Sequence, residues 1–214
     1  MPTEKNVRRK AVWGAAMICG VSTLLLTSCG SQVREGEASS YLVIQSLEGS
    51  SGAEPGEFGN PVFSDVQTFV NDEDIPCCPT FFNDLGQAVF RLVMKDPGTA
   101  GSPTTPTPNN WITLTQYRVT FFRTDGRNTP GVDVPHGFDG AITATVREET
   151  TVSFDLVRNA AKLDAPLRAL RFGGGANLIH AIAEITFFGH DQTGREVSVT
   201  GRINIHFGDF GDPE

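Results

Sequence analysis

The strongest constraint on the fold is an alternating pattern near the C-terminal end of the chain. In EVSVTGRINIHF, residues 196–207, every second side chain is polar. The positions between them hold Gly201 and five apolar residues: Val197, Val199, Ile203, Ile205 and Phe207. Successive side chains of a strand point to opposite faces, so the pattern predicts an antiparallel strand with one buried face and one wet face. The turn DQTG, with Gly194, predicts a hairpin with IHAIAEITFFGH, residues 179–190.

Shorter runs with similar composition precede this hairpin. Separated by Gly, Pro, Asn and Asp, they predict strands over residues 41–47, 62–70, 87–95, 111–124, 141–146 and 151–157. The charged turn REET joins the last two runs, which predicts a second hairpin. Leu163, Leu167 and Leu170 follow at helical spacing and predict a short crossover helix between Asp164 and Arg171.

The run WITLTQYRVTFFRT, residues 111–124, changes phase partway along. Apolar residues up to Leu114 occupy one parity, whereas those from Tyr117 onward occupy the other. A regular strand would send the two sets to opposite faces. The change of phase therefore predicts a β-bulge near Thr115 and Gln116.

About seven strands and one short crossover helix predict an all-β domain over residues 41–214. We expect an antiparallel immunoglobulin-like or fibronectin-III-like sandwich. Its long loops are predicted at residues 48–61, 71–86 and 97–110. Binding residues of such domains are commonly found on loops at the ends of the sandwich.

The N-terminal segment has the layout of a secretory signal. Four basic residues precede an uncharged, largely apolar run over residues 11–28: Lys5, Arg8, Arg9 and Lys10. A transmembrane helix needs about 20 apolar residues. This run is slightly short, contains Gly14 and Gly20, and lacks a basic cluster after it. The sequence therefore predicts a signal peptide over residues 1–28.

The end of this leader, Leu26, Thr27, Ser28 and Cys29, resembles the lipobox of bacterial lipoproteins. The resemblance implies cleavage between Ser28 and Cys29, a diacylglyceryl group on the Cys29 sulfur, and usually acylation of the new amino group. Two or more acyl chains hold a protein stably at a membrane. We therefore expect a lipid-anchored protein of the bacterial cell envelope. In Gram-negative bacteria, an Asp directly after the lipidated Cys is associated with retention in the inner membrane. This chain has Gly30 at that position, which points to the outer membrane.

Residues 29–40 are small and polar and predict a flexible tether behind the lipidated end. Without residues 1–28 the chain has 13 basic and 24 acidic residues, a formal charge of −11. Such a chain lacks the basic stripe that phosphate binding needs, so no nucleic-acid partner is predicted. The segments RNTPGVDVP and AEITFFGHDQTGREVSVTG resemble a group of uncharacterised bacterial envelope lipoproteins, which implies no particular activity.

Two cysteines remain once the leader and the anchor are set aside. They are Cys77 and Cys78, whose Cα atoms lie about 3.8 Å apart across a trans peptide. Disulfides prefer about 4.4 to 6.8 Å, so a ring between neighbours is strained. A vicinal disulfide of Cys77 with Cys78, an intermolecular bridge, and a structural role without redox chemistry all stay open in an oxidising compartment.

Motifs for catalysis and metal binding are sparse. The chain has no nucleophile elbow, zincin helix, Walker loop or EF-hand loop. His180 and His190 share one strand parity, and His206 lies on the wet face of the neighbouring strand, so a surface metal site is one interpretation. Solvent-facing polar side chains are the simpler one. No metal and no cofactor are therefore predicted.

The most acidic loop, NDEDIPCCPTFFND, covers residues 71–84. Its carboxylates are Asp72, Glu73, Asp74 and Asp84. Calcium takes about six to eight oxygen ligands, but the loop lacks the glycine and the alternating ligands of a calcium loop, so a solvated acidic loop is predicted. Phe81 and Phe82 predict either an exposed apolar patch or a cap on the core.

The leading hypothesis for function is a non-enzymatic, lipid-anchored domain that binds or organises another envelope component. That partner is a protein, peptidoglycan or another glycan, and the membrane is contacted through the lipid. One alternative is an envelope enzyme with dispersed catalytic groups, among them Asp133, His136 and His190. A calcium-dependent adhesive module is another.

Overall fold

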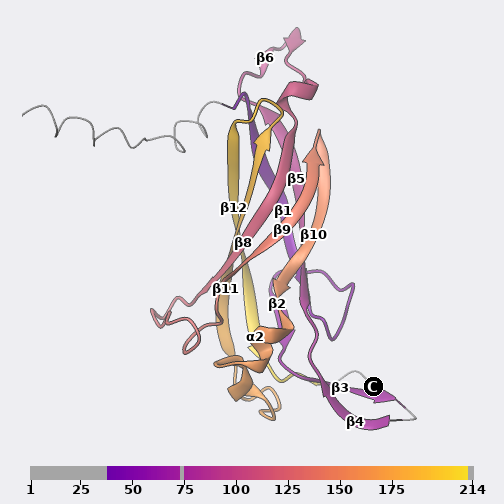
Figure 1. Ribbon diagram of the computed structural model, residues 1–214, viewed down its shortest axis with the longest axis vertical. Coiled ribbons are helices and arrows are strands. Elements are labelled where there is room, and N and C mark those ends of the chain that lie inside the picture. The colour runs from indigo at the N-terminus through magenta and orange to yellow at the C-terminus, as the bar shows by residue number, and fades with distance from the viewer. Residues whose placement is uncertain (1–37, 73–74, 212–214) are drawn as a thin grey trace, which may run out of the picture.

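The computed structural model describes residues 38–72 and 75–211. Two large sheets form the body of the domain (Figure 1). The first has the strand order β1-β5-β10 and contains β1 (Ser40–Ser50), β5 (Asp84–Met94) and β10 (Glu149–Val157). The second has the order β2-β12-β11-β8-β9 and contains β2 (Val62–Asp65), β8 (Ile112–Phe122), β9 (Phe138–Val146), β11 (Ile179–Asp191) and β12 (Glu196–Gly208). Neighbouring strands are antiparallel except β2 and β12, which run parallel.

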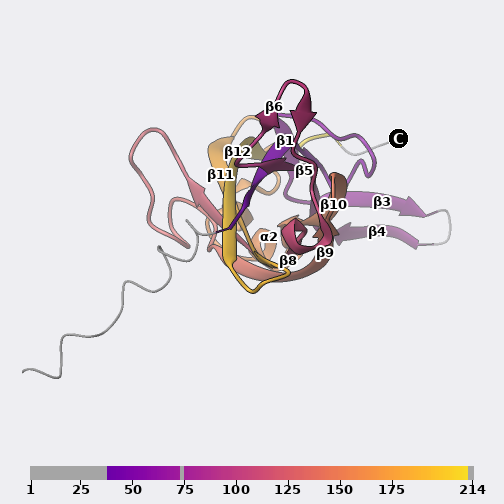
Figure 2. The ribbon, with the colours of Figure 1, turned by 90° about the horizontal axis from the view of Figure 1, so that it is seen from above.

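Smaller elements are attached to this body. A hairpin of β3 (Thr68–Asp72) and β4 (Ile75–Thr80) projects to one side in Figure 2. The two-residue strands β6 (Gly98–Thr99) and β7 (Ser102–Pro103) form a second small hairpin. The helical segments are short: the 3-10 helices η1 (Pro108–Asn110) and η2 (Leu167–Leu170), and the α-helix α2 (Asn159–Leu163). The prediction of an all-β fold is thus confirmed for the described residues.

The hairpin with the strongest alternating pattern is confirmed. β11 and β12 pair along their whole length, with Ile185 opposite Gly201. The inward side chains of Ile203, Ile205 and Phe207 are almost fully buried, whereas that of Val199 is half-buried. The polar parity faces solvent, as expected for a sheet with one wet face.

The predicted β-bulge in β8 is confirmed as well. The pairing of β8 with β11 passes from Leu114 opposite Gly189 directly to Gln116 opposite Phe188, which leaves Thr115 as the extra residue. Leu114 and Tyr117 are consequently both buried, although three positions separate them. The bulge therefore directs apolar side chains of both parities into one core.

The core lies between the two sheets. The ring of Phe90 on β5 meets that of Phe187 on β11 edge-on, with centroids 4.8 Å apart. Phe154 on β10 lies 5.2 Å from Phe187 and 5.2 Å from Tyr117 on β8. Such pairs add about 0.5 to 1.5 kcal/mol each beyond the burial of their area. This aromatic cluster joins strands of both sheets.

The two sheets also approach each other at their edges. β1 packs beside β12, and β9 packs beside β10. The resulting domain is elongated, with residue 38 at one end and α2 and the β3–β4 hairpin at the other (Figure 1). We call these the proximal end and the distal end.

Some predicted connections differ from the structure. The hairpin of residues 141–146 with 151–157 is wrong, because β9 belongs to the second sheet and β10 to the first. The turn between them passes from one sheet to the other, and both strands still face the shared core. The body has eight strands rather than about seven. The helix expected between Asp164 and Arg171 is the 3-10 helix η2, which α2 precedes.

The packed part of the chain begins before β1. Ala38 and Ser40 are buried, and the Ser40 hydroxyl donates to the carbonyl of Asn110 at 3.0 Å. The amide of Lys95 donates to the carbonyl of Ser39 at 3.0 Å. Residues 38–40, the end of the predicted tether, are thus packed on the domain. Within residues 38–72 and 75–211, no helix has the length and apolar character needed to cross a membrane.

Candidate functional site

A buried ion pair lies at the base of the distal end. Asp84 is the first residue of β5, and Lys162 lies in α2. The Lys162 ammonium donates to the Asp84 carboxylate at 2.7 Å, and their side chains are 1% and 0% exposed. Removing two charges from water costs several kcal/mol per ion, which is recovered only when the remaining hydrogen-bonding capacity is satisfied.

Two further donors complete the surroundings of Asp84. The hydroxyl of Ser64, on β2, donates to one carboxylate oxygen at 2.5 Å. The amide of Gly52, in the loop after β1, donates to the other at 2.9 Å. The carboxylate therefore ties β2, β5, α2 and the β1–β2 loop together. Because the acceptor is ionised, these hydrogen bonds are among the stronger kind.

Neighbouring side chains position α2 and the segment after it. Asn83 accepts from the amide of Asn159, the first residue of α2, at 2.7 Å, and donates to Asp155 at 3.2 Å. Arg171 donates to the carbonyl of Lys162 at 2.7 Å, while its guanidinium lies 4.3 Å from the centre of the Phe81 ring. These contacts fix the chain on both sides of residues 163–170.

A second buried carboxylate holds the C-terminal segment. Asp65, at the end of β2, accepts from the hydroxyl of Thr68 at 2.8 Å and from the amide of Phe210 at 3.1 Å. Burial raises the pKa of Asp65, while these hydrogen bonds oppose the rise. Burial also lowers the pKa of Arg171, with a further contribution from Arg168. The distal end therefore rests on a scaffold of enclosed polar groups.

Exposed apolar side chains surround this scaffold. Phe172 is 79% exposed and is the one non-glycine residue with a positive φ, 60°, in the described chain. The left-handed backbone region disfavours bulky side chains, so this conformation is a cost that other contacts must offset. Four further exposed apolar residues lie on several segments of the distal end, and we give these four and Phe172 the collective name distal apolar surface: Phe63, Phe82, Leu163 and Leu178.

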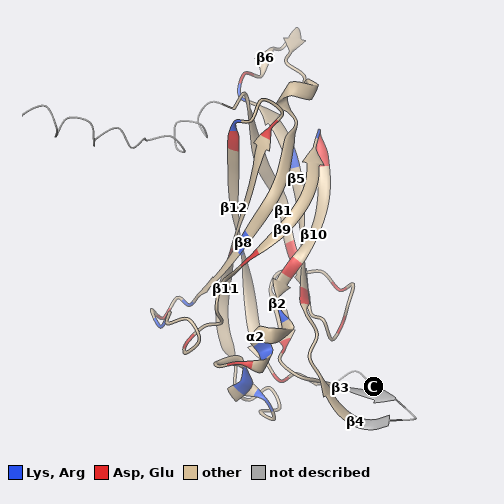
Figure 3. Ribbon diagram, in the orientation of Figure 1, with Lys and Arg blue, Asp and Glu red and all other residues tan. Residues whose placement is uncertain are grey.

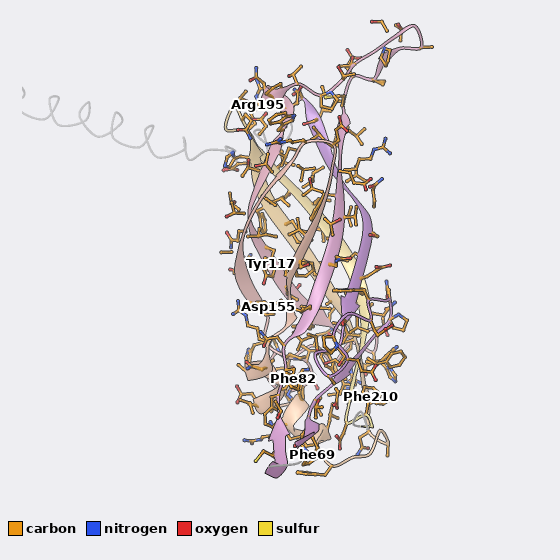
Figure 4. All side chains as sticks on the ribbon, turned by 90° about the vertical axis from the view of Figure 1, so that its right-hand side faces the viewer. Phe69, Phe82, Tyr117, Asp155, Arg195 and Phe210 are labelled. Carbon is orange, nitrogen blue, oxygen red and sulfur yellow. The ribbon has the colours of Figure 1, made fainter. Side chains whose placement is uncertain are left out.

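Figures 3 and 4 show how the distal end differs from the rest of the domain. Phe82 and Phe210 lie at this end, with Arg195 at the opposite one (Figure 4). Several basic residues lie in and after α2, whereas other basic residues and the acidic ones are spread over the strands and loops (Figure 3). Arg168, in η2, is an exposed basic residue of this end.

The structure brings two of the scattered histidines together. His180 on β11 lies directly opposite His206 on β12, and their Nδ1 atoms are 2.5 Å apart. Phe63 lies beside His206, with ring centroids 5.4 Å apart. Burial, together with the neighbouring His180, lowers the pKa of His206. In residues 38–72 and 75–211, no group of three or more His, Cys, Asp and Glu side chains could hold a metal ion.

The predicted acidic loop is corrected by the position of Asp84. Asp84 is buried in the ion pair with Lys162 and does not belong to a solvated loop. The sequence does not reveal this, because Lys162 comes close to Asp84 only in the folded chain. Phe81 is half-buried under Arg171, and Phe82 is 36% exposed, so the two phenylalanines divide the predicted roles of cap and patch.

The predicted sulfur sites lie largely outside the described part. The side chain of Cys78 is exposed. The side chain of Cys77, together with Ser28, Cys29 and the rest of the leader, lies outside the part of the chain whose side chains are described. Signal cleavage, lipidation and a Cys77–Cys78 disulfide therefore stay predictions.

The dispersed groups of the enzyme alternative are spread over two regions. Asp133 and His136 share the loop between β8 and β9, which lies beside Val119. The partner of Val119 on β11 is Ile185. His190 is five residues further along β11, about 17 Å away at the usual rise of a strand. These three side chains do not form one cleft.

An open hollow of about 400 Å3 lies among loops away from the distal end. It is lined by Pro106, Trp111, Arg147, Glu148 and Glu149. The Arg147 guanidinium lies 4.6 Å from the centre of the Trp111 ring. One face of this ring is therefore occupied by a cation and is not free to stack against a sugar.

Comparison with protein-family models, curated proteins and solved structures found no match to this chain in any of the three.

Two residues of the distal end could not be recognised from the sequence. Lys162 sits alone in the apolar segment NAAKL, where a single lysine gives no hint of a partner 78 residues away. Phe172 directly precedes three glycines, and the end of the helical pattern at these glycines is the only feature of the sequence that marks this position.

Proposed function

We propose that this chain is a lipid-anchored, non-enzymatic binding domain of the bacterial cell envelope. It engages an apolar segment of another envelope protein through the distal apolar surface. The observation that carries this proposal is Phe172, which combines a left-handed backbone with 79% exposure. A strained backbone that presents an aromatic ring to solvent brings no packing benefit to the isolated fold.

Aromatic anchors contribute much of the binding energy in protein interfaces, usually inside a polar rim. The distal apolar surface has Phe172, Phe63 and Phe82 as such anchors, and Arg168 is an exposed basic residue of the same end. Because the exposed side chains of this surface are apolar and offer no hydrogen-bonding groups to sugar hydroxyls, they favour a protein segment over a glycan as the partner. The exposed guanidinium of Arg168 favours an acidic group at the edge of that segment.

The proposed anchor suits this arrangement. A chain held by lipid at Cys29 enters the domain at its proximal end, by Ala38. The distal end is then the part of the domain furthest along the body from the point of attachment. Two acyl chains suffice for stable anchoring, so the domain needs no contact of its own with the bilayer.

We further propose that the all-β domain is an immunoglobulin-like sandwich. The support is its two facing sheets, mostly antiparallel, with one shared core. The parallel pairing of β2 with β12 departs from the seven-stranded antiparallel arrangement. We interpret β2 as an edge strand added to the second sheet.

The test is photo-crosslinking from the distal end in the native envelope. The full chain carries p-benzoylphenylalanine in place of Phe172, and a light-dependent adduct with a second protein is expected. The matched control places the same probe at Tyr41, an exposed aromatic residue at the proximal end. A Cys29→Ala chain with the Phe172 probe should leave the membrane fraction and give less adduct.

Different outcomes of this experiment test the binding surface and the lipid anchor. Equal adducts from positions 172 and 41, or no protein adduct from position 172, contradict the binding surface. A saccharide adduct at position 172 contradicts a protein partner. Unchanged membrane recovery of the Cys29→Ala chain contradicts the anchor.

A further inference from the structure

We propose that His180 and His206 form a surface binding site for a divalent transition-metal ion, Cu²⁺ in preference to Zn²⁺. The two imidazoles project from directly opposite positions of β11 and β12. Their Nδ1 atoms face each other at 2.5 Å, with ring centroids 4.5 Å apart and an interplanar angle of 78°. This site goes beyond the proposed binding function and does not depend on it.

The spacing of the two nitrogens is close to what a metal requires. Imidazole nitrogens bind Zn²⁺ or Cu²⁺ at about 2.0 to 2.1 Å, so two neighbouring ligands of one ion stand roughly 2.9 to 3.4 Å apart. The present separation is shorter by less than about 1 Å on that comparison. Small rotations of the two side chains open this gap while the paired backbones stay in place.

The surroundings hold one ring and leave the other accessible. Phe63, the neighbour of His206 on β2, packs beside it with centroids 5.4 Å apart. Phe210 meets Phe63 edge-on at 5.7 Å and supports that wall. His180 is exposed and open to an incoming ion. One ligand is thus pre-oriented, which lowers the entropic cost of binding.

The donor set decides which ions fit. Two neutral imidazoles suit borderline ions such as Cu²⁺, Ni²⁺ and Zn²⁺, whereas Mg²⁺ and Ca²⁺ need oxygen ligands. Across such ions, affinity for nitrogen sites rises to Cu²⁺ and falls again at Zn²⁺. The other positions around the ion are filled by water, because no third His, Cys, Asp or Glu in the described residues joins the pair.

The experiment titrates the full chain with Cu²⁺ alone and with Zn²⁺ alone. Its four cysteines are replaced by serine, so that no thiol competes for the metal. Calorimetry should show saturable one-to-one binding, tighter for Cu²⁺, and electron paramagnetic resonance should show coupling of Cu²⁺ to imidazole nitrogens. Losing even an outer-shell partner costs about tenfold in metal affinity, so His180→Ala should weaken binding by at least about tenfold.

His190→Ala is the matched control, since His190 is an exposed histidine of the same strand that lies opposite Glu196. It should leave the affinity unchanged. His206→Ala should behave as His180→Ala does, and circular dichroism reports whether each variant is folded. An absence of saturable binding, or equal losses in the His180 and His190 variants, overturns the proposal. A hydrogen-bonded histidine pair without metal is then the correct description.

Discussion

At the scale of residues, the ion pair of Asp84 and Lys162 determines the structure of the distal end. Each charge is enclosed, and the carboxylate has three donors: the Lys162 ammonium, the Ser64 hydroxyl and the Gly52 amide. An enclosed pair is roughly neutral for stability when complete, but breaking it by removing one partner is costly. Its role is therefore to define where α2 lies against β5.

Lys162→Met should destabilise the domain by about 3 to 5 kcal/mol, because Asp84 is left as an uncompensated buried charge. Adding Asp84→Asn should recover part of this loss, since the neutral amide still accepts from Gly52. Urea unfolding measures both free energies. The control is Arg118→Met in the exposed pair with Asp139, where little change in stability is expected because solvent screens the two charges. A double variant no more stable than Lys162→Met contradicts this account.

At the scale of elements, two glycines let aromatic rings cross the strands that face them. Gly86 on β5 lies opposite Phe154, and Gly140 on β9 lies opposite Tyr117. A methyl group built on either glycine meets the opposite ring directly. The rings lie over the glycines and reach the core, and the Tyr117 hydroxyl accepts from the amide of Asp155 at 3.2 Å (Figure 4).

Gly140→Ala and Gly86→Ala should each destabilise the domain by about 1 to 3 kcal/mol, the usual cost of overpacking. Thermal unfolding followed by circular dichroism measures the effect. Gly101→Ala, in the small β6–β7 hairpin, is the control, because no atom lies within 4 Å of its added methyl group. Its effect should stay within about 0.5 kcal/mol. If all three variants lose equal stability, backbone freedom rather than ring packing explains these glycines.

At the scale of the whole molecule, one core unites residues from the start of the described chain to its end. Ala38 belongs to this core, as do Val62, Phe154 and Phe207. The two sheets meet at both pairs of edges, so removal of either end of the chain affects the same cooperative unit. The boundary between tether and domain is therefore set by the first residue that packs on the core.

A chain that begins at Ala38 should unfold at the same urea concentration as the full chain. A chain that begins at Leu42 should be less stable by about 1 to 3 kcal/mol, because hydrogen bonds through Ser39 and Ser40 contribute about 1 kcal/mol each. The comparison is made without lipid, in Cys29→Ala for the full-length chain. Equal stability of the two shortened chains would place the boundary after Tyr41 and contradict the contribution of Ser39 and Ser40.

Much of the strand architecture could be predicted, because the period of two is a property of the backbone itself. The hairpin of β11 and β12 and the bulge at Thr115 both follow from which parity is apolar. The same patterns do not say which strand lies next to which. β9 and β10 each bury one face, and that condition is met equally by one hairpin or by two facing sheets.

The sequence by itself determined which side chains face the core, because alternation follows from local backbone geometry. Only the tertiary structure decided which distant groups meet. Lys162 reaches Asp84 across 78 residues, and Phe172 is held outward by a backbone that no local pattern predicts. The physical reason is that an enclosed charge is stable only beside its partner, and this partner arrives only when the two sheets close on one core.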